Sequence, residues 1–210
     1  MSLRLIGYRY SVYSWAARMA LAEAGQVAEW QEADPFDTKM QDWLRAHHPF
    51  GRVPVLRDGD FRIYETVAIL AYLLGVEHDR KRRARKQQVI GIADGYGYRP
   101  LVRQVFSHGV FRPTAGAAAD DAKFAEGLAA AAPVLGALDE IAAEGLALDR
   151  ATVGAADCHL APMIGYFVEA PQGAALLAET PALARWFAVV SRRESYISTK
   201  PDLTELRAGS

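Results

Sequence analysis

The sequence predicts an α/β amino-terminal part followed by an all-helical carboxy-terminal part. Before residue 75, short apolar segments alternate with helix-forming segments, which is the pattern of strands alternating with helices. An Asp-Gly turn between two further apolar segments predicts a hairpin. From residue 80 onward the chain reads as helices alone. We therefore expect two domains, residues 1–75 and residues 80–210, joined by a short linker.

The beginning of the chain predicts a strand–helix–strand–helix order. Ser14 is expected to open the first helix, which is rich in Ala, Leu and Met, and Gly25 is expected to end it. Pro35 ends the second strand. A strand–helix–strand start favours parallel pairing through a right-handed crossover. The expected elements are strand 3–8, helix 15–24, strand 28–33 and helix 38–46.

The segment from His48 to Thr66 predicts a hairpin with a proline at its mouth. Pro54 cannot donate to a strand ladder, so it marks a strand start or edge, and its peptide bond is one of the few that can be cis. The turn follows at Asp58-Gly59-Asp60. Glu65-Thr66 then precedes an apolar run, which places an acid and a hydroxyl at a helix N-terminus beside free N–H groups.

The second half predicts a set of packed helices. Residues 155–169 are apolar almost all round, which indicates a buried helix. Pro171 and Pro181 each open a shorter helix, since proline suits the first turn. The expected helices are 80–112 (one long helix or two), 117–143, 155–169, 171–179 and 181–192.

Composition excludes several classes of function. The 210 residues carry a net charge of −1, and the pI is near 6.5. This argues against a nucleic-acid partner, which needs a strongly basic face. We expect no membrane partner, because no apolar run approaches the roughly 20 residues needed to span a bilayer. The amino terminus lacks a secretory layout, so we expect a cytoplasmic protein.

Two local features are interpreted as structural. The run Arg80–Lys86 contains six basic residues in seven positions, and we interpret it as a solvated first helical turn rather than a nucleic-acid patch. Cys158 is the only cysteine, so an internal disulfide is impossible. Cys158 and His159 are adjacent on a helix and do not share a face, so we expect no metal site.

The residues after the first strand and after the hairpin are those that can bind a ligand. Ser11 lies beyond the carboxyl end of a strand, where ligands of open α/β sheets bind, although a polar loop with a helix cap is the alternative. Glu65 can pair with a ligand's ammonium while Thr66 and nearby N–H groups take its carboxylate. A cis-proline turn would expose the backbone of Val53 for strand-like pairing with a peptide ligand.

The ordered set of these motifs resembles the cytosolic glutathione transferases. The first loop is similar to the serine motif of the phi and zeta classes, and Asp58-Gly59-Asp60 most resembles a phi-like hairpin. Gly154-Ala155-Ala156-Asp157 resembles the family's buried capping box before its central helix. The resemblance rests on Tyr10 to Trp15, His48 to Pro54, Tyr64-Glu65-Thr66, Gly154 to Asp157 and Pro181 to Trp186.

The resemblance implies a fold and a reaction. The fold would be a thioredoxin-like α/β domain plus an all-α domain, and the function would be a glutathione S-transferase acting in detoxification as a homodimer. Ser11 would donate a hydrogen bond to the sulfur of glutathione and stabilise its thiolate, which then attacks a small electrophile. A free thiol titrates near about 8.5, so a decrease of about two units populates the thiolate at neutral pH. Glutathione would be the cosubstrate, with no metal.

The resemblance also implies binding roles for particular residues. Val53 would pair with the cysteinyl unit through its backbone beside Pro54, and Glu65 and Thr66 would hold the γ-glutamyl end. The glycyl carboxylate would reach Lys39, a point charge, or Arg52, a planar fork. Arg99 and Arg103 lie beside aromatic residues where the family's electrophile site borders a long helix, and would suit a planar or anionic acceptor. Candidate electrophile contacts are Tyr10, Tyr13, Ser14, Tyr98, Arg103 and Phe106.

Departures from the pattern leave alternatives open. Tyr13 stands where zeta-like motifs have Cys, which argues against a zeta-type isomerase. Gly154 replaces the usual capping hydroxyl, at a cost of only about a few tenths of a kcal/mol. Transferase, peroxidase and isomerase activities all reuse one thiolate. Ser14 or Tyr10 is the alternative to Ser11 at the sulfur. A non-catalytic binding or protein-interaction module with the same fold is the alternative function.

Overall fold

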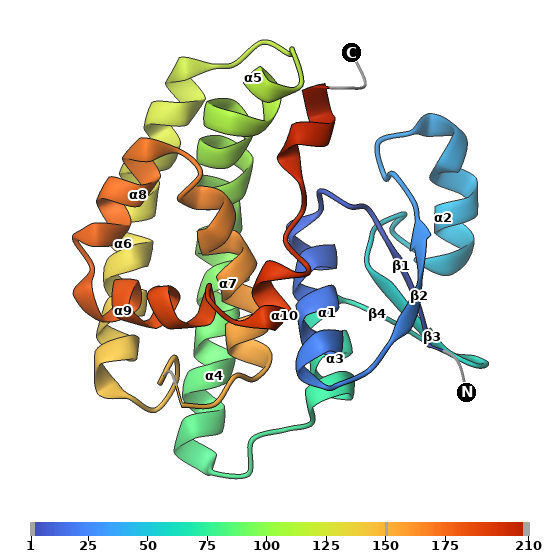
Figure 1. Ribbon diagram of the computed structural model, residues 1–210, viewed down its shortest axis with the longest axis horizontal. Coiled ribbons are helices and arrows are strands. Elements are labelled where there is room, and N and C mark those ends of the chain that lie inside the picture. The colour runs from blue at the N-terminus through green and yellow to red at the C-terminus, as the bar shows by residue number, and fades with distance from the viewer. Residues whose placement is uncertain (1–2, 150, 208–210) are drawn as a thin grey trace.

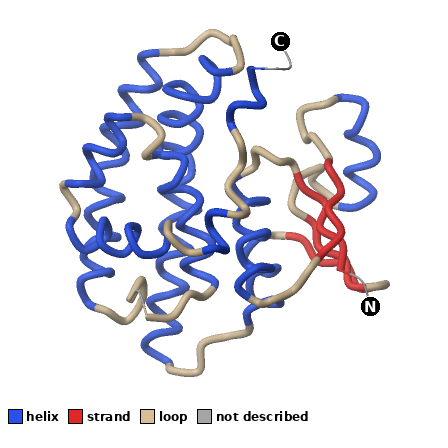
Figure 2. Tube along the Cα trace, viewed as in Figure 1, coloured by secondary structure: helices blue, strands red, loops and turns tan. Residues whose placement is uncertain are grey.

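A computed structural model describes residues 3–149 and 151–207. Its amino-terminal part is a four-stranded sheet in the order β2-β1-β3-β4 (Figures 1 and 2). β1 pairs in parallel with β2 and antiparallel with β3, and β4 completes the hairpin. The predicted parallel start and hairpin are thus confirmed. The elements are β1 (Leu3–Gly7), α1 (Val12–Glu23), β2 (Ala28–Glu32), η1 (Thr38–Met40), α2 (Gln41–His47), β3 (Val55–Asp58), β4 (Phe61–Tyr64) and α3 (Thr66–Leu74).

The sheet is covered on both faces because its central strands, β1 and β3, carry buried apolar residues on both sides. α1 and α3 lie between the sheet and the helical part, and α2 covers the opposite face (Figure 1). On the α2 side, Ile6 and Val55 pack with the buried Leu44. On the other side, a single hydrophobic cluster runs from β1 and α1 into the helices beyond residue 80. The division at residues 75–80 stays a prediction, because the two parts share this core.

The helical part is built around α7, which is buried over nearly its whole length. The remaining helices surround it (Figure 1). Among the described residues, no single helix is long and apolar enough to cross a membrane, and the only candidate by length and composition is the pair α8 and α9, bent by 118°. The elements are α4 (Arg80–Ile92), η2 (Ala93–Phe111), α5 (Arg112–Thr114), α6 (Asp121–Glu144), α7 (Ala155–Phe167), α8 (Pro171–Ala178), α9 (Pro181–Val190), α10 (Glu194–Ile197) and η3 (Leu203–Arg207).

Asp157 fixes the start of α7. Its carboxylate accepts hydrogen bonds from the backbone N of Gly154 at 3.0 Å and from the indole N–H of Trp186 at 2.8 Å. Burial raises the pKa of Asp157, so these two donors offset the cost of a carboxylate without water. Only this arm of the predicted capping box can form, since Gly154 has no side chain. Asp157 thereby joins α7 to α9.

Two predicted helix starts are wrong, for the same physical reason. α1 begins at Val12 rather than after Ser14, because the Ser11 side chain accepts from the backbone N of Ser14 and caps the helix three residues earlier. α6 begins at Asp121 rather than near residue 117, because Asp120 caps it through the backbone N of Lys123. In both cases, the residue whose side chain caps the helix sets its boundary.

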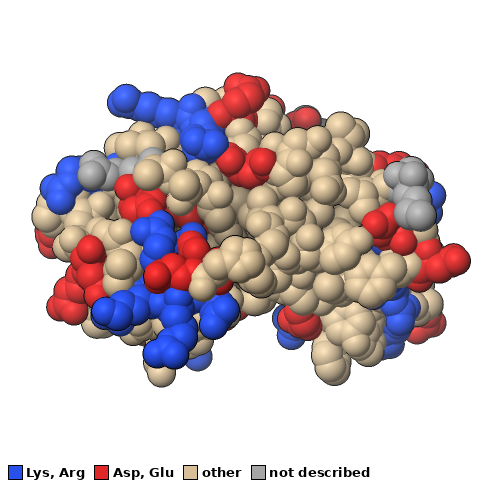
Figure 3. Space-filling view, turned by 90° about the horizontal axis from the view of Figure 1, so that it is seen from below, with Lys and Arg blue, Asp and Glu red and all other residues tan. Residues whose placement is uncertain are grey.

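The segment 80–112 forms one continuous helix through α4, η2 and α5, ending at Thr114, rather than two. Its basic first turns are partly neutralised by acids of other elements. Lys86 pairs with Glu77 at 2.8 Å, Arg85 donates to Glu144 at 3.1 Å and Arg82 pairs with Asp149. Figure 3 shows Lys and Arg at this end interspersed with Asp and Glu. Mixed charge of this kind is typical of a solvated helix end.

Candidate active site

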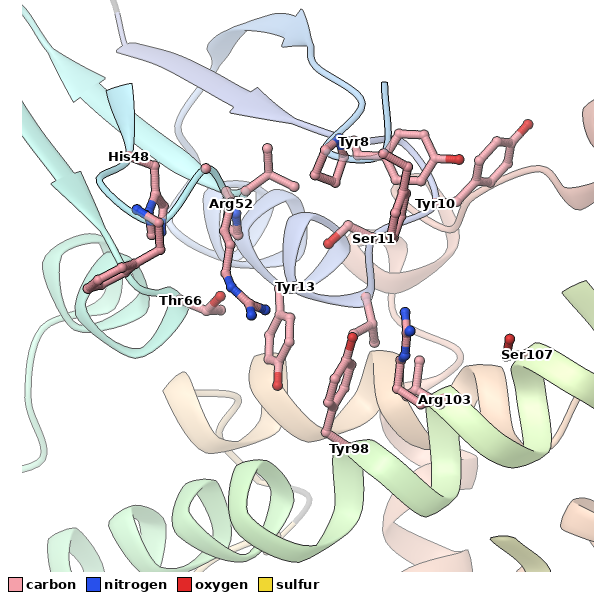
Figure 4. Close-up of a pocket in the computed structure, with 18 of the residues that line it drawn as sticks. Tyr8, Tyr10, Ser11, Tyr13, His48, Arg52, Thr66, Tyr98, Arg103 and Ser107 are labelled. Carbon is pink, nitrogen blue, oxygen red and sulfur yellow. The ribbon is translucent and has the colours of Figure 1, made fainter. Parts of the chain in front are cut away.

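A cavity of about 1120 Å³ lies between the α/β part and η2. Its walls come from the loop after β1, the loop before β3, the start of α3 and one side of η2 (Figure 4). The structure brings most of the predicted site residues together here. Those that line the cavity are Tyr10, Ser11, Tyr13, Arg52, Val53, Pro54, Glu65, Thr66, Tyr98, Arg103 and Phe106.

Three predicted residues do not line the cavity: Ser14, Lys39 and Arg99. Ser14 is fully buried in α1, and its hydroxyl oxygen accepts a hydrogen bond from the backbone N of Tyr8 at 3.2 Å. Its hydroxyl therefore shapes the loop after β1. Lys39 lies exposed in η1, outside the cavity lining, and Gln41 lines the cavity instead.

Ser11 combines a cap with an open hydroxyl. Its oxygen accepts from the backbone N of Ser14 at 3.3 Å, which stabilises the start of α1. A hydroxyl that accepts one bond still has its proton to donate, and in Figure 4 the Ser11 side chain projects into the cavity. Tyr8 lies beside it, and burial together with Asp34 raises the pKa of Tyr8 to about 12, so this neighbour is a neutral phenol at pH 7. The cap and functional interpretations of Ser11 are thus compatible.

The opposite end of the cavity exposes backbone groups that folding leaves unused. The Val53–Pro54 peptide bond is cis, and Val53 lies just before β3. Glu65 precedes α3 with φ of +70° and ψ of 118°, a backbone region that favours glycine. Its side chain is 63% exposed. Thr66 begins α3, where free N–H groups attract an anion.

His48 supports Glu65 and was missed as a site residue. The backbone N of Phe50 donates to its Nδ1 at 3.2 Å, so the proton of the neutral ring is on Nε2, which faces Glu65 Oε1 at 3.8 Å. Burial, helped by Arg52 and Arg62 and opposed by Glu65, lowers the pKa of His48. In the sequence, His48 stands beside His47 without other metal-binding or catalytic residues at a useful spacing, so the sequence assigned it no role.

η2 aligns its cavity residues through an unusual winding. Each backbone N–H of this helix donates to the carbonyl five residues earlier, as the N–H of Arg112 does to the carbonyl of Ser107. This gives about 4.4 residues per turn, against about 3.6 in an α-helix. Asp94 and Arg103, nine residues apart, thus lie about two turns apart on one side, as do Arg103 and Arg112. In an α-helix, nine residues make two and a half turns, so they would face opposite ways.

A second hydrogen-bond network lies in the wall of the cavity. Tyr13 donates its hydroxyl to Asp94 Oδ1 at 3.0 Å, and Nε2 of the buried His159 lies 2.8 Å from the same oxygen. Burial opposes ionisation of Asp94, but the bonds from His159 and Tyr13 prevail and lower its pKa. Asp94 and His159 were not predicted, because they are 65 residues apart in the sequence.

The described residues were also compared with the requirements of a metal site. Within residues 3–149 and 151–207, no three His, Cys, Asp or Glu residues lie close enough to hold an ion. Cys158 is buried beside His159, and burial raises the pKa of its thiol well above the usual value. Its thiol is therefore inert at neutral pH.

Comparison with known proteins identifies the class. Residues 5–80 match the family model described as Glutathione S-transferase, N-terminal domain. Glutathione S-transferase F7 of Arabidopsis thaliana is 29% identical over 158 residues, covering 70% of this chain and 74% of that protein. Glutathione S-transferase F13 of the same plant is 24% identical and covers 75% of each chain. The amino-terminal domain thus belongs to the glutathione S-transferase family, which confirms the resemblance.

Solved structures establish the fold of the whole chain. Glutathione transferase F7 from Populus trichocarpa matches with a TM-score of 0.79 at 21% identity, covering 98% of this chain and 99% of that one. Glutathione S-transferase-I, solved with the ligand lactoylglutathione, matches with a TM-score of 0.80 at 21% identity, covering 98% and 100%. The predicted thioredoxin-like domain followed by an all-helical part is therefore confirmed.

The lowered pKa of His48 predicts how the free energy of unfolding depends on pH. The folded protein resists protonating this ring, whereas the unfolded chain takes up a proton below the ordinary pKa of 6.5. The contribution of His48 to the free energy of unfolding is therefore present above pH 6.5 and lost as the pH falls through the folded pKa. We expect the stability difference between wild type and His48→Gln, measured by urea denaturation, to shrink between pH 7.5 and 5. A difference that stays constant or grows would contradict this.

Proposed function

We propose that this protein is a glutathione S-transferase that conjugates glutathione to a small electrophile, with Ser11 stabilising the thiolate. The observation that carries the proposal is the meeting, in one cavity, of the Ser11 hydroxyl, the Val53 backbone beside a cis proline, and Glu65-Thr66 at a helix start. These groups match the thiol, the peptide backbone and the charged γ-glutamyl end of glutathione. The names of the curated relatives support the same activity.

Each part of glutathione has a complementary group in this proposal. The γ-glutamyl ammonium pairs with Glu65, whose carboxylate is held near His48. The γ-glutamyl carboxylate meets Thr66 and the N-terminus of α3. The cysteinyl unit pairs with the Val53 backbone, and Arg52, whose side chain extends into the cavity in Figure 4, meets the glycyl carboxylate. Lys39 lies outside the cavity lining, so Arg52 carries that role alone.

The chemical step follows from the position of Ser11. The thiol proton leaves to solvent, and the Ser11 hydroxyl donates to the sulfur that remains. The thiolate then forms a carbon–sulfur bond with the electrophile, whose leaving group departs with the electron pair. A hydrogen bond to the charged form of an acid lowers its pKa. Ser11 thus raises the fraction of glutathione present as thiolate at neutral pH.

Ser11→Gly tests the catalytic role, since glycine keeps most of the helix cap and removes the hydroxyl. We expect turnover with glutathione and chlorodinitrobenzene to fall by about tenfold to a hundredfold, while calorimetry shows a Kd for glutathione within about threefold of wild type. The pH profile of turnover should move toward the free thiol pKa of about 8.5.

Ser14→Ala is the matched variant. Because Ser14 is buried, its turnover per folded molecule should stay close to that of wild type. A loss in Ser14→Ala but not in Ser11→Gly would move the catalytic role to Ser14. Wild type that binds glutathione but turns over none of a panel of electrophiles would favour the non-catalytic binding module. No binding of glutathione at millimolar concentration would overturn the proposal.

Two variants of Glu65 test its role in glutathione binding separately from its effect on stability. Because Glu65 adopts a backbone conformation that favours glycine, Glu65→Gly should unfold at the same urea concentration as wild type or a higher one. Glu65→Ala keeps the strain and should be less stable than Glu65→Gly by about 1 kcal/mol. Both variants lack the carboxylate, so we expect glutathione affinity to fall at least about tenfold in each. Glutathione affinity unchanged in both variants would exclude Glu65 from the site.

We also propose a homodimer. Phe61, Tyr72 and Val76 are exposed by about half or more, and the rings of Phe61 and Tyr72 lie 5.4 Å apart across β4 and α3. An exposed apolar patch of this kind is typical of an interaction surface. Sedimentation velocity should give twice the chain mass of 23.0 kDa, and Phe61→Ser should shift the protein toward monomer. A wild-type mass of one chain would contradict the proposal.

A further inference from the structure

Two arginines of the cavity wall have no carboxylate partner among residues 3–149 and 151–207. Arg103 and Arg112 lie about two turns apart on the same side of η2 and the start of α5, and both line the cavity. Within the described parts of the chain, no carboxylate oxygen lies within 4 Å of either guanidinium; Arg112 donates its Nε to the carbonyl of Ala118. The predicted pair was Arg99 and Arg103, but Arg99 lies outside the lining and pairs with Glu126 at 3.5 Å.

The one carboxylate on this wall is already engaged. Asp94 accepts from both Tyr13 and His159 through the same oxygen, at 3.0 and 2.8 Å. Among the described residues, it forms no ion pair with the arginines further along η2. The remaining acid of the lining, Glu65, lies at the start of α3, where the proposed function assigns it to the ammonium of glutathione. The η2 wall thus presents two guanidinium groups without an ion-pair partner among the described residues to the second substrate.

Aromatic side chains lie beside this charge. Phe111 is half-buried, and its ring is tilted by 51° to that of the buried Phe106, with ring centroids 6.0 Å apart. Tyr10 packs edge-on against Phe111 at 5.7 Å. Aromatic side chains favour contact with another ring, edge to face or offset. Together with two guanidinium groups that lack a carboxylate partner among the described residues, they favour an aromatic ring that carries an anion.

Figure 4 shows labelled η2 side chains opposite the reacting group. The side chains of Tyr98 and Arg103 extend from η2 into the cavity, toward the side on which Ser11 lies. Ser11 belongs to the α/β wall and Arg103 to the helical wall. A molecule between them would present its electrophilic carbon to a thiolate at Ser11 and a substituent to Arg103.

We propose that the second substrate is an aromatic electrophile that carries a carboxylate, bound by the guanidinium of Arg103 and attracted by Arg112. This inference rests on the proposed function and names the substrate class of that site. In the reaction, the glutathione sulfur bonds to a ring carbon and the leaving halide takes the bonding electron pair. The carboxylate is unchanged and serves only for recognition. A planar guanidinium binds a carboxylate through two parallel hydrogen bonds, which an amide cannot accept.

Two matched ligands test the proposal without catalysis. Dinitrobenzoate and dinitrobenzamide have the same ring and size, and neither has a leaving group. We expect calorimetry to show that glutathione-saturated wild type binds the carboxylate at least about tenfold more tightly than the amide. Arg103→Gln should abolish this preference, and Arg103→Lys should retain part of it. Arg99→Gln is the matched control, because Arg99 lies outside the lining, and it should keep the full preference.

Conjugation rates give the second readout. For chlorodinitrobenzoate and chlorodinitrobenzamide, each corrected for its uncatalysed rate, we expect kcat/KM of wild type to favour the carboxylate by about tenfold, and Arg103→Gln to remove this preference. Equal binding of the two probes by wild type, or a preference that survives in Arg103→Gln, would overturn the inference. Weaker binding of glutathione itself in Arg103→Gln would also overturn it by assigning Arg103 to the first substrate. Arg103-dependent binding of dinitrobenzoate without any conjugation would support the carboxylate site and contradict the proposed function.

Discussion

The burial of α7 is the constraint on which both walls of the site depend. This helix lies at the centre of the core, and Asp157 fixes its start. From it, Tyr166 donates its hydroxyl to the carbonyl of Tyr10 at 3.1 Å, next to the loop that carries the proposed donor to sulfur. From the same helix, His159 reaches Asp94 on η2 at 2.8 Å. A buried hydrogen bond that loses one partner leaves the other unsatisfied, so these contacts hold the two walls in one arrangement.

The groups proposed to bind glutathione keep hydrogen-bonding capacity or charge after folding. The Ser11 oxygen accepts a hydrogen bond that caps α1, and its hydroxyl proton can still be donated. Val53 presents backbone beside a cis peptide bond, and Glu65 is strained and mostly exposed. Glu65 adds little to the free energy of unfolding, since exposed charges contribute little and strain opposes folding. Ser11 differs, because its cap stabilises the start of α1.

Charge divides the cavity into two unlike ends. At the α/β end, Glu65 stands near Arg52 and the dipole of α3, which together suit a zwitterion. On the helical wall, Asp94 is engaged by two donors while Arg103 and Arg112 are not neutralised. Positive charge on this wall attracts a diffusing anion, which agrees with the second substrate proposed for it. The winding of η2 places Arg103 and Arg112 on the same side of the helix, and it thereby sets the charge of the site proposed for the second substrate.

Local chemistry was readable from the sequence, and long-range geometry was not. The hairpin, Pro54 at its mouth, Glu65 before a helix and the buried apolar helix all follow from short-range rules for turns, proline and apolar periodicity. Ser14 was misassigned as a helix start, because the cap is formed by a side chain three residues earlier. The partner of His159 and the direction of Arg103 came only from the tertiary structure. Their physical cause is packing around α7 and hydrogen bonds that run from residue i to i+5 in η2, which no apolar period of about 3.6 residues reveals.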